Sequence, residues 1–327
     1  MAHMIDMSND RANMAYVGEK PWHDLGNELT SGASFDEWKI AAGMEWTIAH
    51  APLQFVNMDG SAIVVPDKKA LYRSDNGVYL STVGKSFKVV HPGEVLEFFR
   101  DLTESQGYTL ETAGCLYDGQ KFWAMARTGM GMRLKGTDLV NGFLLLSTSC
   151  DGTMATTAKF TSVRVVCQNT LTMSLNDRSN ASVRVKHKTE FNPEQVKMQL
   201  GLEIWSEFSE TVEQLADTGF DRKDKASMKD FLVSVFQGDM AKELDDQPNK
   251  RGMVATFNAL INSPGSDLAS AKNTAWGAIN AVTHYVDHQL PTRGDNATVN
   301  RFVSSQWGNG EKLKQRAWDY FSDKIAA

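Results

Sequence analysis

The stretch NGFLLLSTSCDGTMATTAKFTSVRVV, residues 141–166, predicts a pair of antiparallel strands and with it the class of fold. Apolar and β-branched residues fill both halves, and Asp151-Gly152 lies between them as a hairpin turn signal. Similar signals occur earlier, at Asp59-Gly60, Asp75-Asn76-Gly77 and Asp118-Gly119. This succession of short strands and tight turns favours an antiparallel sheet over alternating βαβ units.

Helix signals accompany and follow these strands. Ser34 is placed to cap a helix over residues 35–42, and Pro92-Gly93 opens another helix. After Asn192-Pro193, apolar residues recur at helical spacing, with one long helix expected from Leu268 onward. We therefore predict an α+β fold, in which an N-terminal antiparallel β-sheet with packed helices precedes a mainly helical C-terminal region. The expected segments are a tag remnant and flexible N-terminus (1–13), an α+β sheet domain (14–191) and a helical region (192–327).

Composition indicates in which cellular compartment the protein is expected. The chain of 327 residues has a net charge of −6 and three cysteines, none of them in a CxxC pair. Scattered cysteines are typical of free thiols in a reducing compartment. No stretch resembles a signal peptide or a membrane span. We expect a cytoplasmic protein with no membrane partner.

A cationic segment interrupts this acidic chain. Residues 159–188 carry six Lys and Arg side chains but one acidic residue, Asp177. In residues 182–189, valines alternate with cations, so a strand here would present its cations on one face. Such a row suits a phosphate backbone, although an ordinary solvated edge strand is the alternative. The predicted nucleic-acid-binding residues are Lys159, Arg164, Arg178, Arg184, Lys186 and Lys188.

A second candidate site surrounds Arg164. If the chain turned into a helix at residues 168–170, the free amide groups of that helix would favour an anion beside the guanidinium. The possible anion pocket consists of Arg164, Cys167, Asn169 and Thr170. Alternatively, Arg164 is internal and holds loop carbonyls or a carboxylate such as Asp151.

Two histidines one helical turn apart, His284 and His288, have the spacing of metal ligands. Tyr285 stands where a zinc protease would need glutamate, and no third ligand is identifiable, so helix-packing or surface histidines are the preferred interpretation. Residues 82–88 and 129–136 do not satisfy nucleotide-binding fingerprints. We therefore predict no cofactor and no bound metal. If a metal were bound, His284 and His288 would be its candidate ligands.

Four stretches carry a resemblance to a known family. They are MAYVGEKPWHDLG (14–26), LLLSTSCDGTMATTAKFTSVRVVCQNTLTMSL (144–175), AINAVTHYVDH (278–288) and GNGEKLKQRAWDYF (308–321). Over nearly its whole length the chain resembles the phage/plasmid-like protein family, a domain of unknown function found in phages, prophages and plasmids. The chain departs from the family pattern at Cys150, where His is expected, and at His284, where an acidic residue is usual.

The resemblance implies a cytosolic protein of mobile elements, active in DNA metabolism. It marks Trp22, His23, Arg164, Cys167 and Asn169 as family positions. From this we expect a non-enzymatic protein that binds or anneals single-stranded DNA during recombination and forms a homo-oligomer. Trp123 or Tyr117 would then serve as a stacking platform for bases.

Two other functions remain open at this point. The first is an enzyme or nucleotide- or small-anion-binding protein that uses Arg164, Cys167 and Asn169. The second is a protein-interaction module, such as an inhibitor of host defence, whose acidic helical half contacts a host protein.

Overall fold

The computed structural model describes residues 6–8, 11–18, 26–164, 169–172, 182–193, 196, 204–237, 250–292 and 297–326. Strands dominate the first part of this chain and helices the last part, so the predicted α+β fold class is confirmed.

The chain forms two compact units, each assembled from separated segments. Unit 1 comprises Met1–Gly129, Phe143–Lys159 and Ser182–Gly201, and unit 2 comprises Met130–Gly142, Phe160–Ala181 and Leu202–Ala327. Strands β9 (Lys121–Leu134), β10 (Asp138–Ser149) and β11 (Thr156–Arg164) therefore each begin in one unit and end in the other. The sequence predicts one boundary after residue 191, whereas the chain passes between the units several times.

The largest sheet of the described residues has the strand order β12-β11-β10-β9-β8-β3-β4, and β13 also pairs with β11. Strands β3 and β4 run parallel, whereas β8 is antiparallel to both β3 and β9. Two short strands, β1 (Met7–Ser8) and β2 (Arg11–Ala12), form a separate ribbon. The remaining strands of the large sheet are β3 (Met14–Val17), β4 (Asn27–Leu29), β8 (Thr109–Leu116), β12 (Asn169–Thr172) and β13 (Ser182–Val185).

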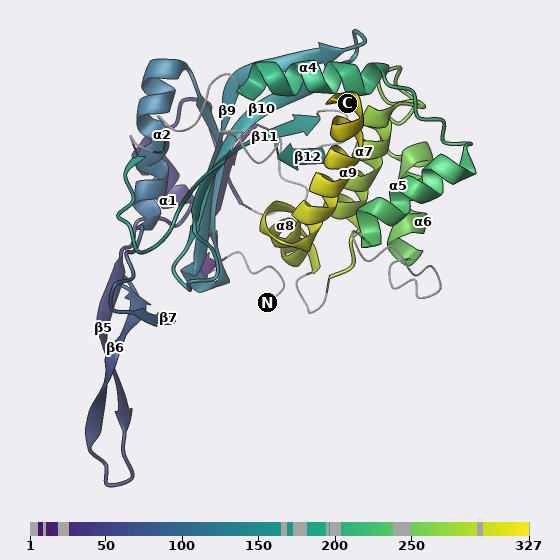
Figure 1. The fold of residues 1–327 in the computed structure, drawn as a ribbon. Helices are drawn as coiled ribbons and strands as arrows, with labels where there is room; N and C mark the ends of the chain where they lie inside the picture. Colours follow the sequence, from purple (N-terminus) through teal and green to yellow (C-terminus); the bar gives the residue numbers. More distant parts are fainter. Residues whose placement is uncertain are drawn as a thin grey trace. The chain divides into compact units, whose positions relative to one another are not determined.

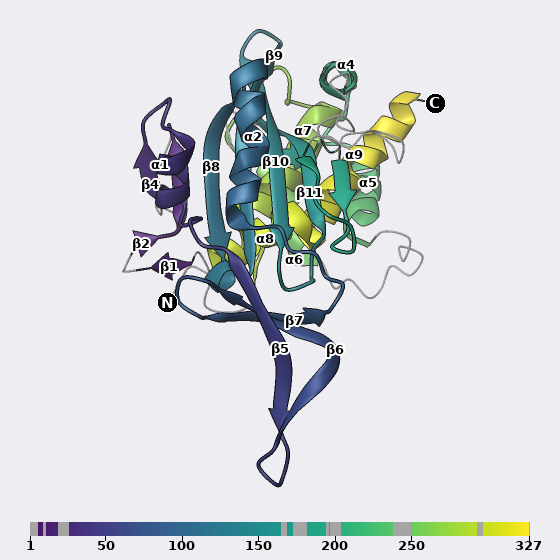
Figure 2. The same cartoon turned by 90° about the vertical axis from the view of Figure 1, so that its left-hand side faces the viewer.

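Helices α1 and α2 lie in the described part of unit 1. Helix α1 (Phe35–Ala41) begins at the predicted cap, where Ser34 accepts a hydrogen bond from the Glu37 amide and Glu37 bonds back to Ser34. Helix α2 (Pro92–Gln106) lies along the face of the sheet near β8 (Figure 2). Its Phe98 and Phe99 are fully buried, and their burial holds the helix on the strands.

A three-stranded sheet, β5 (Ile48–Val56), β6 (Ala62–Arg73) and β7 (Tyr79–Gly84), completes unit 1. Strand β7 pairs with β6 only from Lys68 to Tyr72, so the outer parts of β5 and β6 have no third strand beside them. They extend away from the rest of unit 1 as a two-stranded ribbon (Figure 1). We call residues 53–66 the arm.

Aromatic side chains build the core of unit 2. Phe208 stacks on Trp318 with ring centroids 5.4 Å apart, and Phe231 packs against Phe321. The described helices of unit 2 are α4 (Ile204–Asp217), α5 (Lys225–Gln237), α6 (Lys250–Asn262), α7 (Ala275–His284), the π-helical segment η3 (Tyr285–Gln289), α8 (Ala297–Trp307) and α9 (Asn309–Ala326).

Helix α7 begins later than the apolar spacing predicts. Asn273 has a left-handed backbone (φ 56°), which ends any helix from Leu268, and Thr274 then caps α7 by accepting from the Gly277 amide at 3.1 Å. A Cβ at Gly277 would lie 1.8 Å from the carbonyl oxygen of Ala271, so only glycine fits this turn. Among the described residues, no helix combines the length and apolar character needed to span a bilayer.

Candidate nucleic-acid interface

Strand β13 presents Arg184 on the solvent face, as its sequence pattern predicts. It pairs antiparallel with β11, placing Arg184 opposite Thr157 and Val183 opposite Ala158. Val183 is 8% exposed, while Arg184 and Lys186 are exposed, so the valine faces the protein and the cations face solvent. The predicted alternation is confirmed for residues 182–185, whereas Lys186 and Lys188 follow the strand in a loop and turn.

His187 fixes the chain directly after this strand. Its ring stacks on Phe87 with centroids 4.3 Å apart, Nδ1 lies 3.0 Å from the carbonyl oxygen of Lys88, and Nε2 lies 3.0 Å from that of Met154. Both neighbours are carbonyl acceptors, and the tautomer of the ring decides which of its nitrogens donates. The His187 side chain points toward the protein, whereas the flanking Lys186 and Lys188 are exposed.

Cations from two other parts of unit 1 meet this segment. The Lys88 amide donates to the carbonyl of His187 at 2.5 Å, and the Lys85 amide donates to the carbonyl of Asp67 at 3.0 Å. The Lys69 ammonium donates to the carbonyl of Phe87, and burial, together with the charge of Lys88, lowers the pKa of Lys69. We call the cations around this junction the basic surface; its members are Lys68, Lys69, Lys85, Lys88, Arg184, Lys186 and Lys188. Lys68 and Lys69 are consecutive in β6, so they extend from its two faces.

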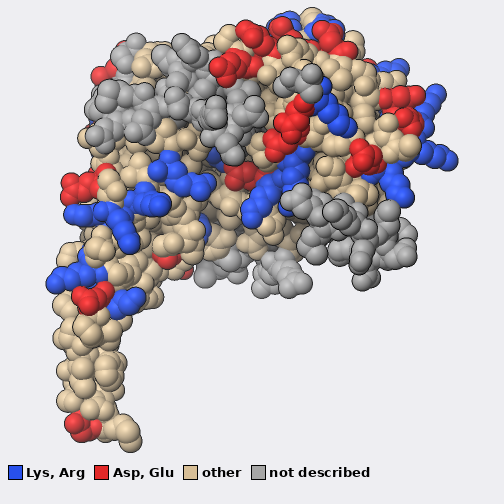
Figure 3. All heavy atoms as spheres, in the orientation of Figure 1, with Lys and Arg blue, Asp and Glu red and all other residues tan. Residues whose placement is uncertain are grey.

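Few carboxylates offset these charges. Lys88 pairs with Glu190 at 2.9 Å, and hydrogen bonding to Lys88 lowers the pKa of the Glu190 carboxyl. Both side chains are well exposed, so the pair is worth little and yields readily to another anion. Figure 3 shows Lys and Arg gathered where the arm joins the rest of unit 1.

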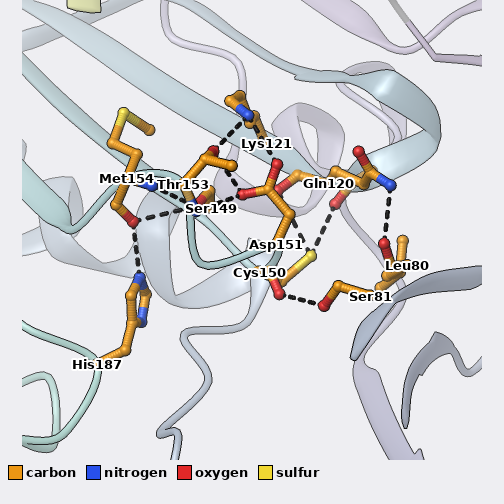
Figure 4. A network of polar contacts seen from close by, with 11 residues as sticks. Leu80, Ser81, Gln120, Lys121, Ser149, Cys150, Asp151, Thr153, Met154 and His187 are labelled. Atoms are coloured by element: carbon orange, nitrogen blue, oxygen red, sulfur yellow. Dashed lines mark hydrogen bonds and ion pairs between the residues drawn. The ribbon is translucent and has the colours of Figure 1, made fainter. Parts of the chain in front are cut away.

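The turn between β10 and β11 positions a carbonyl group that contacts the His187 ring. Ser149 and Met154 exchange hydrogen bonds across the turn, which positions the Met154 carbonyl that receives the histidine ring (Figure 4). Asp151 accepts from the Thr153 amide at 2.9 Å and pairs with Lys121 at 2.8 Å. Burial alone would raise the pKa of Asp151, but the bonds from Lys121 and Thr153 outweigh it and lower that pKa.

Cys150 ties the same turn to the β7 strand. Its carbonyl accepts from the Ser81 hydroxyl at 2.6 Å, while the Gln120 amide nitrogen Nε2 donates to the Leu80 carbonyl at 2.7 Å (Figure 4). The Cys150 side chain is buried, and desolvation raises the pKa of its thiol to about 12. The thiol is therefore uncharged near neutral pH and is a structural group rather than a nucleophile.

Several residues predicted for nucleic-acid binding do not join the basic surface. Lys159 lies in β11 and is 3% exposed, so its ammonium is buried with the strand. The backbone of Arg164 ends β11, but its side chain lies outside the described part of the chain. Arg178 falls outside the described residues, as do Cys167 and the family-marked Trp22 and His23.

The helix start predicted at residues 168–170 is wrong. Asn169–Thr172 form strand β12, which pairs antiparallel with β11 so that Asn169 lies opposite Arg164 and Thr170 opposite Val163. Without a helix N-terminus, the physical argument that led to the anion pocket no longer holds there.

The predicted stacking platforms also lie elsewhere than on an open surface. Trp123 is 3% exposed and belongs to the core of unit 1. Tyr117 is half-buried, with the Lys121 ammonium 5.3 Å from its ring centroid. Among the described residues of unit 1, the exposed aromatic side chains are instead those of Phe55 and Tyr79, which are 52% and 58% exposed.

The metal candidates His284 and His288 lie together in unit 2, with ring centroids 4.7 Å apart. Desolvation, with the nearby His288, lowers the pKa of His284 to about 4. Asp287 forms an ion pair with the buried Lys314. Over the residues that the structure describes, no cluster of three or more His, Cys, Asp or Glu side chains is arranged to hold a metal ion.

Sequence reasoning missed the lysines from the β6–β7 region: Lys68, Lys69, Lys85 and Lys88. A signal exists in PDKK (66–69) and GKSFK (84–88), which are locally basic. Nothing local connects them to residues 184–188, because that contact depends on pairing across nearly one hundred residues.

The chain is thus an α+β protein whose first unit carries a basic, sheet-based surface. Residues 79–307 match the family described as domain of unknown function DUF932, and this match spans more than half of the chain. The protein therefore belongs to that family. No curated protein and no solved structure matches it. The arm precedes the matched region, while most of the basic surface lies within it.

Proposed function

We propose that this protein binds single-stranded DNA through the basic surface of unit 1. In this proposal it acts in DNA annealing or recombination for a phage, prophage or plasmid, in the cytoplasm and as a homo-oligomer. Annealing needs two strands held at once, which two or more copies of one binding surface provide.

One observation carries the proposal. Cations from three stretches of an acidic chain, most of them exposed, lie around one junction in unit 1, which is held by backbone hydrogen bonds at Lys85 and Lys88 and by the His187 ring. Converging Lys and Arg side chains bind phosphates and release counterions, whatever the base sequence. Exposed Tyr79 lies on the same three-stranded sheet and offers a ring to an unpaired base.

A salt titration of binding tests the proposal. Fluorescence anisotropy of a labelled oligonucleotide should show affinity that falls steeply with salt, with a log–log slope approaching about −5 if all seven cations contact phosphates. Native mass spectrometry of the same mixture reports how many protein copies bind each strand. Absence of binding at low ionic strength would overturn the proposal.

A further inference from the structure

The arm exposes an apolar surface that the rest of unit 1 does not cover. Its exposed apolar side chains are Phe55 (52%), Val56 (73%), Met58 (103%), Ile63 (39%) and Val64 (53%). Phe55 lies opposite Ile63 on one face, and Val56 lies opposite Ala62 on the other, so both faces of the ribbon are apolar. A contiguous patch of this kind marks an interaction site.

The turn at the end of the arm is held rigidly. The Asn57 amide donates to the Ser61 carbonyl at 2.8 Å, and the Ser61 amide donates to the Asp59 carboxylate at 2.9 Å. A preformed turn lets the side chains of the arm be presented without an ordering cost on binding.

Charge separates the arm from its base. Residues 53–66 contain no Lys or Arg, and their one charged side chain is the carboxylate of Asp59 at the turn. On β6 the arm is followed by Asp67 and then by Lys68, where the basic surface begins. Figure 3 shows this contrast between the arm and the cations at its base. A phosphate backbone therefore matches the base of the arm and is repelled at the turn.

The spacing of these two surfaces limits which nucleic acid can contact both of them. Ile63 precedes Lys68 by five positions on one strand, which corresponds to roughly 17 Å at the rise of a β-strand. Phosphates lie on the outside of a nucleic acid and apolar base faces lie inside, at a depth of about 8 Å in the duplex major groove. The spacing on the protein is about twice that depth. A base at Phe55 or Ile63 would therefore belong to a stretch of strand that continues from the basic surface along the arm, and not to the nucleotide whose phosphate is bound there.

We propose that the arm is a wedge that inserts its apolar side chains between DNA bases and holds them unstacked while the basic surface binds the phosphates. This inference rests on the proposed function and names its preferred substrate: DNA with unpaired or partly melted bases, rather than intact duplex. Apolar Phe, Ile and Met side chains are the types that wedge between base steps.

The experiment uses full-length protein and oligonucleotides that contain 2-aminopurine, whose fluorescence rises when the base is unstacked. The variant is Phe55→Ser/Met58→Ser/Ile63→Ser; all three side chains are exposed, and Met58 lies in the turn. Val254→Ser/Phe257→Ser on α6 is the matched control, because these side chains of unit 2 are 52% and 36% exposed. Single Met58→Ser is tested too, since it removes no packing within the protein.

Wild-type protein and the α6 control should both raise the fluorescence on binding. The arm variant should lose that rise and bind about tenfold more weakly, while the salt dependence of its remaining affinity is unchanged. Met58→Ser should lose part of the rise.

Three results would overturn the inference. If the wild type shows salt-sensitive binding without a fluorescence rise, or if the arm variant keeps the rise, then the arm does not act as a wedge. Either result leaves the proposed function unaffected. A change in the oligomeric state of the arm variant, with its fluorescence response intact, would assign the arm to contacts between copies. Complete lack of wild-type binding would instead remove the proposed function itself.

Discussion

His187 and Lys88 lie 99 residues apart in the sequence and are joined in both directions. The Lys88 amide donates to the His187 carbonyl, and His187 Nδ1 lies 3.0 Å from the Lys88 carbonyl. Because Lys88 follows the β6–β7 hairpin and His187 follows β13, this junction brings the cations of both elements onto one surface.

His187→Ala should therefore leave the residues of the basic surface less firmly held relative to one another, although all of its Lys and Arg side chains remain. Loss of the ring contacts with Phe87, Lys88 and Met154 should lower the free energy of unfolding by about 1–2 kcal/mol. DNA affinity should fall severalfold because the cations are no longer held in one arrangement. Urea denaturation and anisotropy measure the two effects. His50→Ala, at an exposed position on β5, should leave both unchanged.

Removal of charge from residues 184–188 should change the salt dependence of binding by an amount that depends on the number of cations removed. Arg184→Gln/Lys186→Gln/Lys188→Gln removes three exposed cations, so the slope of log affinity against log salt should become shallower by about 2. Lys223→Gln/Lys225→Gln/Lys229→Gln makes the same change in charge on exposed positions of unit 2. Equal loss of affinity in both variants would mean that net charge alone, and not the basic surface, drives binding.

Asp151 should contribute more to stability than its partner Lys121. Asp151→Ala removes the turn bonds to Thr153 and leaves the Lys121 ammonium, 17% exposed, without its carboxylate, which should cost about 2–3 kcal/mol. Lys121→Met leaves Asp151 bonded to Thr153 and should cost about 1 kcal/mol. Thermal or urea unfolding of the two variants gives the comparison. The idea fails if Lys121→Met is the more destabilising change.

The pKa of Asp151 adds a pH dependence with a definite sign. Because that pKa is lowered in the folded protein, the stabilisation is present above the ordinary value for an aspartate and is lost as the pH falls through the folded value. The stability of Asp151→Ala should therefore depend less on pH in the acid range than that of the wild type.

Local signals in the sequence predicted many of the elements. The Ser34 cap and Glu37 specify the start of α1, and the Asp151-Gly152 turn specifies the β10–β11 hairpin. Each depends on contacts between residues a few positions apart, which a sequence pattern records directly. The alternation of residues 182–185 is of the same kind.

Long-range pairing explains where local reasoning failed. Gln168, Asn169 and Thr170 have the polar character of a helix start, but pairing with β11 draws Asn169–Thr172 into a strand. In the same way, Lys88 meets the segment after β13 through its contact with His187, which no local pattern records. Such contacts are set by tertiary packing, which overrides local propensity.

His284 should make the stability of the protein depend on pH between about 4 and 6.5. Its pKa is lowered to about 4, chiefly by burial and also by His288, although Asp287 acts in the opposite direction. The fold therefore favours the neutral ring, so this stability is complete above the ordinary histidine pKa and is lost as the pH falls toward the folded value. After allowance for solvent screening, the loss should be about 1–2 kcal/mol.

The measurement is the free energy of unfolding in urea across this pH range for the wild type, His284→Asn and His50→Asn. Carboxylates elsewhere titrate in all three proteins, so the difference between curves isolates the histidine. His284→Asn should show a flatter acid limb than the wild type, because asparagine cannot be protonated in this range. His50→Asn should follow the wild type, because position 50 is exposed. Parallel curves for the wild type and His284→Asn would mean that the buried ring gains its proton without opposing the fold, and that the Asp287–Lys314 pair beside it absorbs the charge.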